Sequence, residues 1–237
     1  MKRYFHVSHP AMLVVLLLLL MTASLVWGAA SRAQPVDAGP ARTGYDPLSP
    51  AEQRVAQETA LQDGRVQALL AGARRTELLL VERHEESKEV YQRNDTWPRR
   101  ADVLIYDYDQ DTLVQAIVNL RTRAADQVDT SRSVQPPLTD HETATALNLA
   151  LADPQAATRL REGYRQSTGQ ELVQPEQIAA SAFIFLGDAI SSAAASPLVA
   201  CRVHRCAQLV ITTPDHTLVD DSLIVDLSSA AVVQSDH

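Results

Sequence analysis

Cysteine is scarce in this chain of 237 residues, because only Cys201 and Cys206 occur. A closed metal site usually takes four ligands, and no further thiolate is present to complete one. The spacing is also not Cys-x-x-Cys, which argues against a redox-catalytic pair. In an oxidising compartment the two thiols are most simply a disulfide; a Cu(I) or Zn(II) site that includes the interposed His204, or two free thiols, stay open as alternatives.

Motifs for common catalytic chemistries are missing as well. The sequence has no Gly-x-Ser-x-Gly elbow and no Gly-rich loop that would cradle phosphates. His84 begins a run of charged residues to Glu89, but no second histidine follows at metalloprotease spacing, so a charged connection between strands is predicted there. We therefore predict no catalytic, cofactor-binding or metal-binding residue, and no cofactor.

Two further stretches have one functional and one structural interpretation each. Residues 107–111 begin like a calcium loop, but Thr112 and Val118 occupy the places that need Gly and Glu, so a solvated hairpin turn is predicted. Trp97 is either an aromatic residue of a binding surface or a loop side chain packed on its own domain.

The N-terminus resembles an export signal. Lys2 and Arg3 precede an apolar run over residues 11–27, and small residues follow, which predicts a secretory signal over residues 1–33 with cleavage after Ala30 or Ala33. An uncleaved membrane anchor over residues 11–27 is the alternative, since about 20 apolar residues can span a bilayer. No cysteine lies near the cleavage site, so a lipid anchor on cysteine is excluded. We predict an exported protein at the periplasm, cell surface or extracellular space.

The charge balance is acidic. Cleavage after Ala33 would remove Lys2, Arg3 and Arg32 and no acidic residue, taking the formal net charge from −8 to −11. Nucleic acid and anionic membrane surfaces would be repelled at long range, so neither is expected as a partner. Contact with a membrane is expected only through the N-terminal segment, if it is uncleaved.

One pattern occurs twice in the chain. Ser49 is followed three places on by Glu52, and ninety positions later Thr139 is followed by Glu142, which are two capping boxes at helix starts. The same register relates several later positions of the two copies: Ala56, Ala60, Leu61, Asp63 and Leu70 in the first, and Ala146, Ala150, Leu151, Asp153 and Leu160 in the second. The chain is therefore predicted to contain a tandem repeat.

Strand patterns follow the helix in each copy. The first helix should run from about Ser49 to Leu70 with a break near Gly64, and the second copy should have helices over 139–152 and from Pro154 to about Glu162, where Gly163 suggests an end. The predicted strands are 76–81, 101–108, 112–120 and 124–128 in the first copy, and 177–186, 208–213, 217–227 and 230–233 in the second.

The predicted fold class is α+β, with two tandem domains that each pack a helix on an antiparallel meander of about four strands. The expected domain limits are 45–133 and 134–237, with a linker over 34–44 that is rich in Pro and Gly.

These stretches resemble a known family. Residues 46–52 with the helix after them, and above all Val134 to Thr139 with Glu142 and Asp153-Pro154, are similar to the N-terminal region of copper amine oxidases. That resemblance implies two small α+β domains that precede a catalytic domain and carry none of its chemistry. The Asn-Tyr-Asp/Glu motif of the quinone cofactor and the His-x-His copper pair are both missing from the sequence.

The resemblance implies a non-enzymatic accessory or interaction module that docks on another protein, such as an amine-oxidase-like catalytic chain. Two alternatives stay open. One is a direct part in amine oxidation or in copper- and quinone-linked amine metabolism that uses Cys201, His204 and Cys206. The other is a structural stalk or envelope module.

Overall fold

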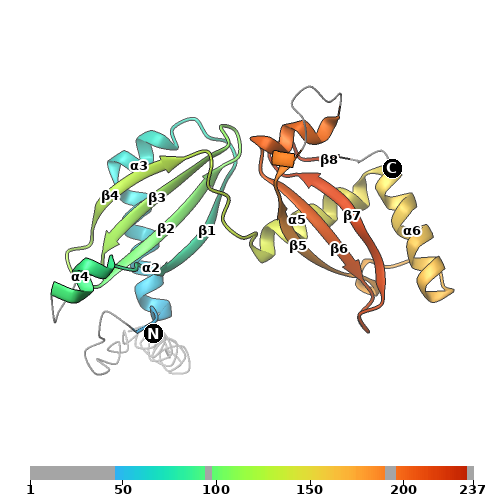
Figure 1. Cartoon of the computed structure of the whole chain (residues 1–237), viewed down its shortest axis with the longest axis horizontal. Helices are drawn as coiled ribbons and strands as arrows, with labels where there is room; N and C mark the ends of the chain where they lie inside the picture. Colours follow the sequence, from blue (N-terminus) through green and yellow to red (C-terminus); the bar gives the residue numbers. More distant parts are fainter. Residues whose placement is uncertain (1–45, 94–97, 190–195, 234–237) are drawn as a thin grey trace, which may run out of the picture. The chain divides into compact units, whose positions relative to one another are not determined.

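A computed structural model describes residues 46–93, 98–189 and 196–233. Residues Thr43–His237 form one compact unit, and two four-stranded antiparallel sheets lie within it (Figure 1). The predicted signal segment 1–33, the linker 34–44 and Trp97 lie outside the described residues. Within the described ranges, no helix has both the length and the apolar character needed to cross a membrane.

The first repeat begins with two helices, and a capping side chain marks the start of each. Ser49 and Glu52 form the predicted capping box at the start of the first helix, and the side chain of Asp63 caps the second. The elements of this repeat are α2 (Pro50–Gln62), α3 (Gly64–Leu69), β1 (Thr76–Arg83), α4 (Lys88–Arg93), β2 (Arg100–Asp107), β3 (Thr112–Asn119) and β4 (Ala124–Ser131). The strands are ordered β1-β2-β3-β4, as a meander requires.

Small side chains let α2 lie close to this sheet. Ala56 and Ala60 are fully buried, one helical turn apart, and α3 adds the buried Val66. Opposite them the sheet presents Ala101, Val103, Ile105, Val114, Ala116 and Val118. Alternate residues of β2 and β3 thus form one apolar face, and burial of that face stabilises the repeat.

The second repeat has the same plan. Thr139 and Glu142 form the second predicted capping box, and Asp153 caps the next helix. The elements are α5 (Asp140–Ala152), α6 (Pro154–Thr168), η1 (Pro175–Gln177), β5 (Ala179–Phe185), η2 (Gly187–Ala189), η3 (Pro197–Arg202), β6 (Cys206–Thr212), β7 (Leu218–Asp226) and β8 (Ala231–Val233). The strand order is β5-β6-β7-β8.

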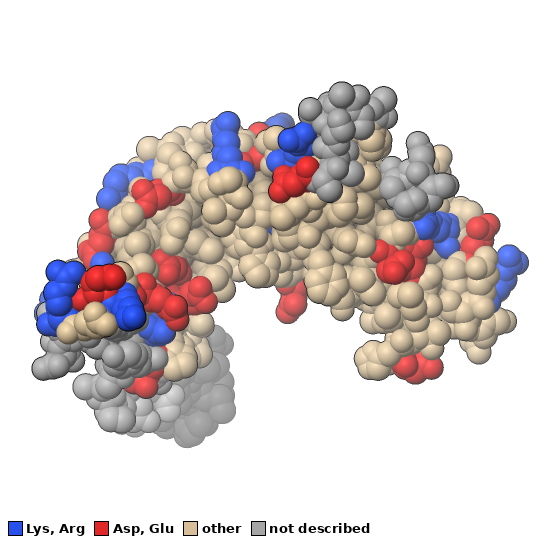
Figure 2. All heavy atoms as spheres, viewed as in Figure 1, with Lys and Arg blue, Asp and Glu red and all other residues tan. Residues whose placement is uncertain are grey.

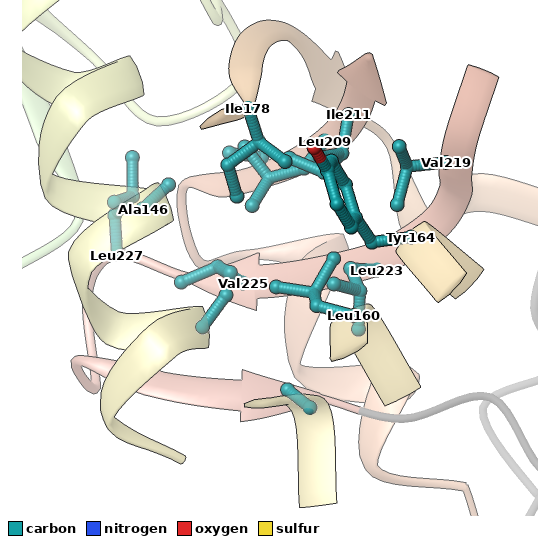
Figure 3. Packing of buried hydrophobic residues seen from close by; sticks show 13 residues of the cluster. Ala146, Leu160, Tyr164, Ile178, Leu209, Ile211, Val219, Leu223, Val225 and Leu227 are labelled. Carbon is teal, nitrogen blue, oxygen red and sulfur yellow. The ribbon is translucent and has the colours of Figure 1, made fainter. Parts of the chain in front are cut away.

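The second core combines small and large helical residues with large strand residues. Figure 3 shows Leu160 and Tyr164 of α6 beside Leu223 and Val219 of β7, with Ala146 of α5 near Leu227. The prediction of two tandem α+β units, each a helix on a four-stranded meander, is confirmed. The predicted limits 45–133 and 134–237 stay predictions.

Three strand ends in the two repeats use the same turn. The side chains of Asp107, Asn119 and Asp226 each accept a hydrogen bond from a backbone N–H two or three residues later. Four residues after each of them the backbone takes a positive φ, at Asp111 (49°), Arg123 (51°) and Ala230 (54°). The predicted hairpin over residues 107–111 is therefore present, and its first carboxylate holds backbone N–H groups.

The prediction that α6 ends near Glu162 is wrong, because the helix continues to Thr168 and ends at Gly169, whose φ is 72°. Gly163 has a packing role instead. A Cβ atom added to it would lie 2.7 Å from the carbonyl oxygen of Val219 in β7. The missing side chain therefore lets α6 lie directly against the sheet.

Candidate functional site

The most deeply buried charge in the described part of the chain belongs to Arg205, which directly precedes β6 and is fully inaccessible to solvent. Its Nε donates to Oε1 of Glu142 at 2.5 Å and its Nη2 donates to Oε2 of the same carboxylate at 2.9 Å. The remaining donors reach Oε1 of Gln135 at 3.1 Å and the carbonyl oxygens of Pro136 and Pro137 at 3.0 and 3.1 Å. All five N–H groups of the guanidinium thus have an acceptor, as a buried charge requires.

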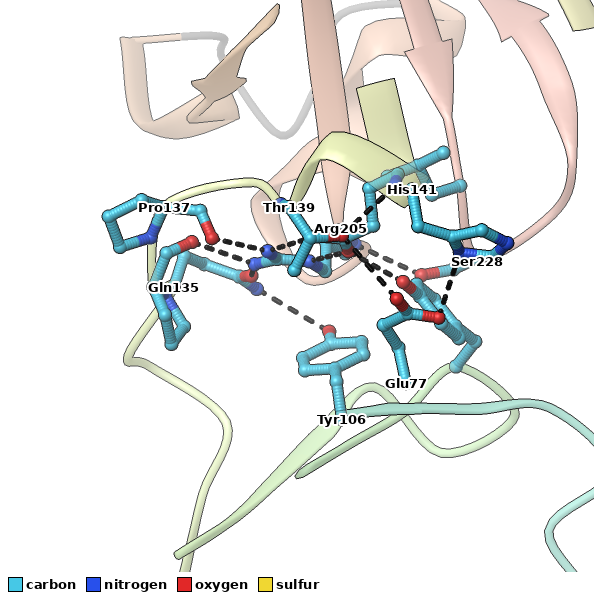
Figure 4. Close-up of polar contacts among 12 residues, drawn as sticks. Glu77, Tyr106, Gln135, Pro137, Thr139, His141, Arg205 and Ser228 are labelled. Atoms are coloured by element: carbon cyan, nitrogen blue, oxygen red, sulfur yellow. Dashed lines mark hydrogen bonds and ion pairs between the residues drawn. The ribbon is translucent and has the colours of Figure 1, made fainter. Parts of the chain in front are cut away.

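The stretch from Val134 to Thr139 supplies most of these acceptors (Figure 4). Two consecutive prolines cannot join a helix or a strand ladder, so their carbonyl groups are left for other donors. Thr139 is the N-cap of α5, and its backbone N–H donates to Oε2 of Glu142 at 2.9 Å, which helps to fix the carboxylate beside Arg205. The stretch from Val134 to Thr139, on which the sequence resemblance rests, therefore supplies acceptors for the side chain of one buried arginine.

The first repeat also contributes to the group of residues around Arg205. Together they form the Arg205 cluster: Tyr106, Tyr108, Gln135, Pro136, Pro137, Thr139, Glu142 and Arg205. The hydroxyl of Tyr108 donates to Oε1 of Glu142 at 2.5 Å, and the guanidinium of Arg205 lies 5.3 Å from the ring centroid of Tyr106. Gln135 donates its side-chain N–H to the Tyr106 hydroxyl at 3.5 Å (Figure 4). The cluster therefore joins β2, the segment between the repeats and the start of β6.

The electrostatics of the cluster fix the charge of each member. Burial alone would raise the pKa of Glu142, but the hydrogen bonds and charge of Arg205, with the Tyr108 hydroxyl and the Thr139 N–H, outweigh it and lower the pKa. Burial, with the charge of Glu142, raises the pKa of Tyr108 well above its ordinary value, and burial raises the pKa of Tyr106 to about 12. At neutral pH both tyrosines are neutral donors beside a charged pair, and neither is a phenolate base.

The first repeat contains an equivalent pair. Arg99 directly precedes β2, and it donates to both carboxylate oxygens of Glu52 at 3.0 and 3.2 Å and to the carbonyl oxygen of Pro47 at 2.9 Å. The carbonyl oxygens of Arg99 and Arg205 also accept from equivalent N–H groups, those of Leu120 and Leu227. The repeat thus includes an arginine that bonds the glutamate of its own capping box.

A cleft of about 330 Å³ lies beside the cluster. Its residues are Arg74, Arg75, Thr76, Glu77, Tyr108, His141, Glu142, Thr145 and Leu227. Arg75 donates to the carbonyl oxygens of Leu227 and Ser228 and lies 5.6 Å from the Tyr108 ring centroid. Glu77 pairs with Nδ1 of His141 at 3.0 Å (Figure 4). Glu77 and His141 are thus paired within the cleft, whereas Arg74 and Arg75 pair with Asp109 and Glu142 pairs with Arg205, and these two partners lie outside its lining. On the face drawn in Figure 2, side chains of both charges lie close together.

The cysteines are close to this cluster in sequence. Cys201 in η3 and Cys206 at the start of β6 form the predicted disulfide, with a Cα–Cα distance of 5.5 Å. The strand predicted over 208–213 begins two residues earlier than expected, because β6 starts at Cys206 itself. In the disulfide the two sulfur atoms are not thiolates, so the alternative Cu(I) or Zn(II) ligand set is not formed in this structure.

His204 lies between two carboxylates instead. Its Nδ1 is 2.6 Å from Oδ2 of Asp226, and its Nε2 is 3.7 Å from Oδ2 of Asp111, which belongs to the first repeat. Asp111 also accepts from the hydroxyl of Ser228. Partial burial opposes protonation of His204, but Asp226 and then Asp111 raise its pKa. The histidine therefore contributes a titratable contact between the repeats.

The other singled-out residues are separate from this cluster. His84 is 3.0 Å from the carboxylate of Asp102, and Glu86 accepts two bonds from Arg100 at 2.8 Å. The charged run over 84–89 is a connection, as predicted, and it leads into the short helix α4, which was not predicted. Within the described ranges, no three His, Cys, Asp or Glu side chains are arranged to hold a metal ion.

Comparison with known proteins finds a solved structure with a similar fold. No protein-family model matches the chain, and no curated protein matches it. A solved structure of a copper-containing benzylamine oxidase from Hansenula polymorpha matches 83% of this chain with a TM-score of 0.51 and 12% identity. The chain shares a fold with part of a copper amine oxidase. It spans 30% of the matched oxidase, and at this identity the likeness shows the fold alone.

A second solved structure, "PPLO at 1.23 Angstroms", matches 78% of this chain and 27% of its own, at 14% identity. Its TM-score of 0.40 is too low to show a shared fold.

Arg99, Arg205 and Tyr108 are the residues that sequence reasoning missed. A single arginine in a sequence is most simply a surface residue, and their partners are 47, 63 and 34 positions away. One signal was present, because Arg99 and Arg205 lie two and three residues before the start of the second predicted strand of their repeats.

Proposed function

We propose that this chain is an exported, non-catalytic accessory module that docks on another protein, with the two tandem domains corresponding to the N-terminal domains of copper amine oxidases. The observation that carries the proposal is the extent of the structural match. It takes in most of this chain but less than a third of the oxidase, so the fold corresponds to a part of a larger enzyme.

The site chemistry supports the same role. The ionised groups of the Arg205 cluster bond to one another, and its two tyrosines are held protonated. A paired and saturated network of this kind stabilises a unique arrangement of the chain, whereas general acid–base catalysis needs a group whose pKa is near the working pH. The disulfide supports an oxidising compartment, as export would provide.

The test is to identify what the native chain contacts. Amine-directed cross-linkers suit it poorly, since Lys2 and Lys88 are its only lysines. A photo-reactive amino acid should instead replace Arg74, which is highly exposed at the rim of the cleft, and separately Arg161, which is exposed on α6 of the other repeat. The variants are expressed in the native envelope, irradiated, and the attached chains identified by mass spectrometry.

Recovery of an oxidase-like chain from either position would support docking. If neither variant captures a protein although both fold and keep the disulfide, docking is rejected. Turnover of an amine together with bound copper in the purified chain would favour the direct role in amine oxidation. An uncleaved segment 11–27 with nothing attached would favour the stalk.

A further inference from the structure

β5 (Ala179–Phe185) is an edge strand of the second sheet (Figure 1). It pairs with β6 along one side, from Ala179 opposite Thr212 to Phe185 opposite Cys206. In the described part of the chain, no strand pairs with its other side. An edge of this kind presents a row of backbone N–H and C=O groups to any strand that can approach.

The other edge strands of the two sheets are guarded in ways that β5 is not. β1 carries Glu77, Glu82 and Arg83, and β4 carries Asp126 and Asp129. β8 has only three residues. Charged side chains and short length are the usual protections against edge-to-edge pairing. β5 reads Ala-Ala-Ser-Ala-Phe-Ile-Phe over seven residues, without a charge or a proline.

The side chains of β5 alternate between two faces. Ala180 and Ala182 pack against the core beneath the helices, so Ser181 and Phe183 project from the opposite face. Phe183 is 60% exposed, the second most exposed of the large apolar side chains in the described residues. A large aromatic ring on an uncharged edge strand is apolar area that a neighbouring strand could cover.

We propose that β5 pairs antiparallel with β5 of a second copy of this chain, about a two-fold axis through Ala182, so that the two sheets join edge to edge. Ala182 is the middle residue of the strand, so this axis pairs all seven residues. The symmetric register places Phe183 of each copy opposite Ser181 of the other, and it brings the two phenylalanine rings together on the diagonal.

The symmetric register matches β5 to itself over its full length, so a second copy is the partner that this strand fits. The formal net charge of −8 makes whole copies repel one another, but β5 adds nothing to that repulsion. β5 is uncharged along its full length, so pairing there sets no two like charges opposite each other. The pairing is independent of the docking proposed above.

One strand pair buries little area, and small interfaces form weak or transient complexes. We therefore expect a monomer–dimer equilibrium with a Kd between about 1 μM and about 500 μM. The experiment is sedimentation equilibrium of the full chain, purified as cells produce it, from about 1 μM to about 500 μM. The average mass should rise with concentration toward that of a dimer.

The decisive variant is Phe183→Lys, which sets two ammonium groups on the diagonal and should weaken dimerisation at least tenfold. Leu61→Lys is the matched control, since it removes another exposed apolar side chain, on α2, and adds the same charge; it should leave the equilibrium unchanged. If Phe183→Lys fails to fold, Ser181→Lys replaces it at the facing position.

Hydrogen exchange gives a second readout, because amides of β5 should become protected only at concentrations where the dimer forms. A wild-type chain that stays monomeric throughout the range overturns the proposal. So does a dimer that Phe183→Lys does not weaken, or protection of β5 in the monomer by another segment of the chain.

Discussion

Arg99 and Arg205 occupy the same place in the two repeats, but only the first keeps contact with solvent. The side chains of Arg99 and Glu52 are 13% and 24% exposed, whereas those of Arg205 and Glu142 are 0% and 2% exposed. The first pair fastens a helix start to its own sheet. The second pair does the same and also receives the Tyr108 hydroxyl from the other repeat. The difference shows that the same capping pair can serve two purposes: Arg99–Glu52 holds one helix start, whereas Arg205–Glu142 also lies at the contact between the repeats.

The largest expected effect is on the buried pair. Arg205→Met leaves the carboxylate of Glu142 buried without its cation, which should lower the free energy of unfolding by about 3–5 kcal/mol. Arg99→Met breaks the more exposed pair and should cost about 1 kcal/mol. Urea unfolding followed by circular dichroism measures both. Equal losses would show that the two pairs do not differ in the way that their burial indicates.

The next effect concerns the helix that follows the capping aspartate in each repeat. Gly163→Ala places a methyl group against the Val219 carbonyl and should destabilise by about 1–3 kcal/mol. Gly64→Ala meets nothing within 4 Å and should be neutral or stabilise by up to about 1 kcal/mol. Thermal unfolding of the two variants compares them directly. A neutral Gly163→Ala would mean that α6 can move away from β7 without loss.

The stability of the protein at low pH should depend on the ionisation of Glu52 and Glu142. Burial opposes ionisation of Glu52, but Arg99 and Ser49 lower its pKa to about 2, and the pKa of Glu142 is lowered as well. A carboxyl with a lowered folded-state pKa stabilises above its unfolded value, near 4.5, and this stabilisation is lost as the pH falls through the folded value.

Unfolding free energies measured from about pH 6 downward should therefore fall below about pH 4.5. Glu52→Gln should remove about 1 kcal/mol of that fall. Glu58→Gln, at an exposed position of the same helix, is the control and should retain it. Identical acid profiles for Glu52→Gln and wild type would exclude a stabilising Arg99–Glu52 pair.

The smallest expected effect is that of His204, which has no counterpart in the first repeat. Its raised pKa means that the protonated form stabilises the fold below the ordinary value near 6.5, and this contribution is lost as the pH rises through the folded value. The effect should be below about 1 kcal/mol, because the side chain is 33% exposed. His204→Asn should flatten the stability profile between about pH 5 and pH 9, and Val203→Ala should not. An unchanged slope in His204→Asn would assign the pH dependence to other groups.

Local patterns in the sequence predicted the fold well. The capping boxes at Ser49 and Thr139 involve residues three apart, and the strands follow from short apolar runs, so both could be found without tertiary information. Gly163 was misinterpreted because its packing partner, Val219, is 56 residues away. The Arg205 cluster was not predicted for the same reason, since sequence spacing does not show which acceptors surround a side chain in the folded protein.

Each arginine of the repeat bonds a glutamate of its own copy, and this has a consequence for how such a chain can arise. A gene duplication that copies one repeat copies donor and acceptor together, so neither new unit contains a charge whose partner was left behind. The second copy then needs only to be covered for its ion pair to become buried. The hydrogen bond from Tyr108 of the other copy to Glu142 could be added later without unpairing either charge.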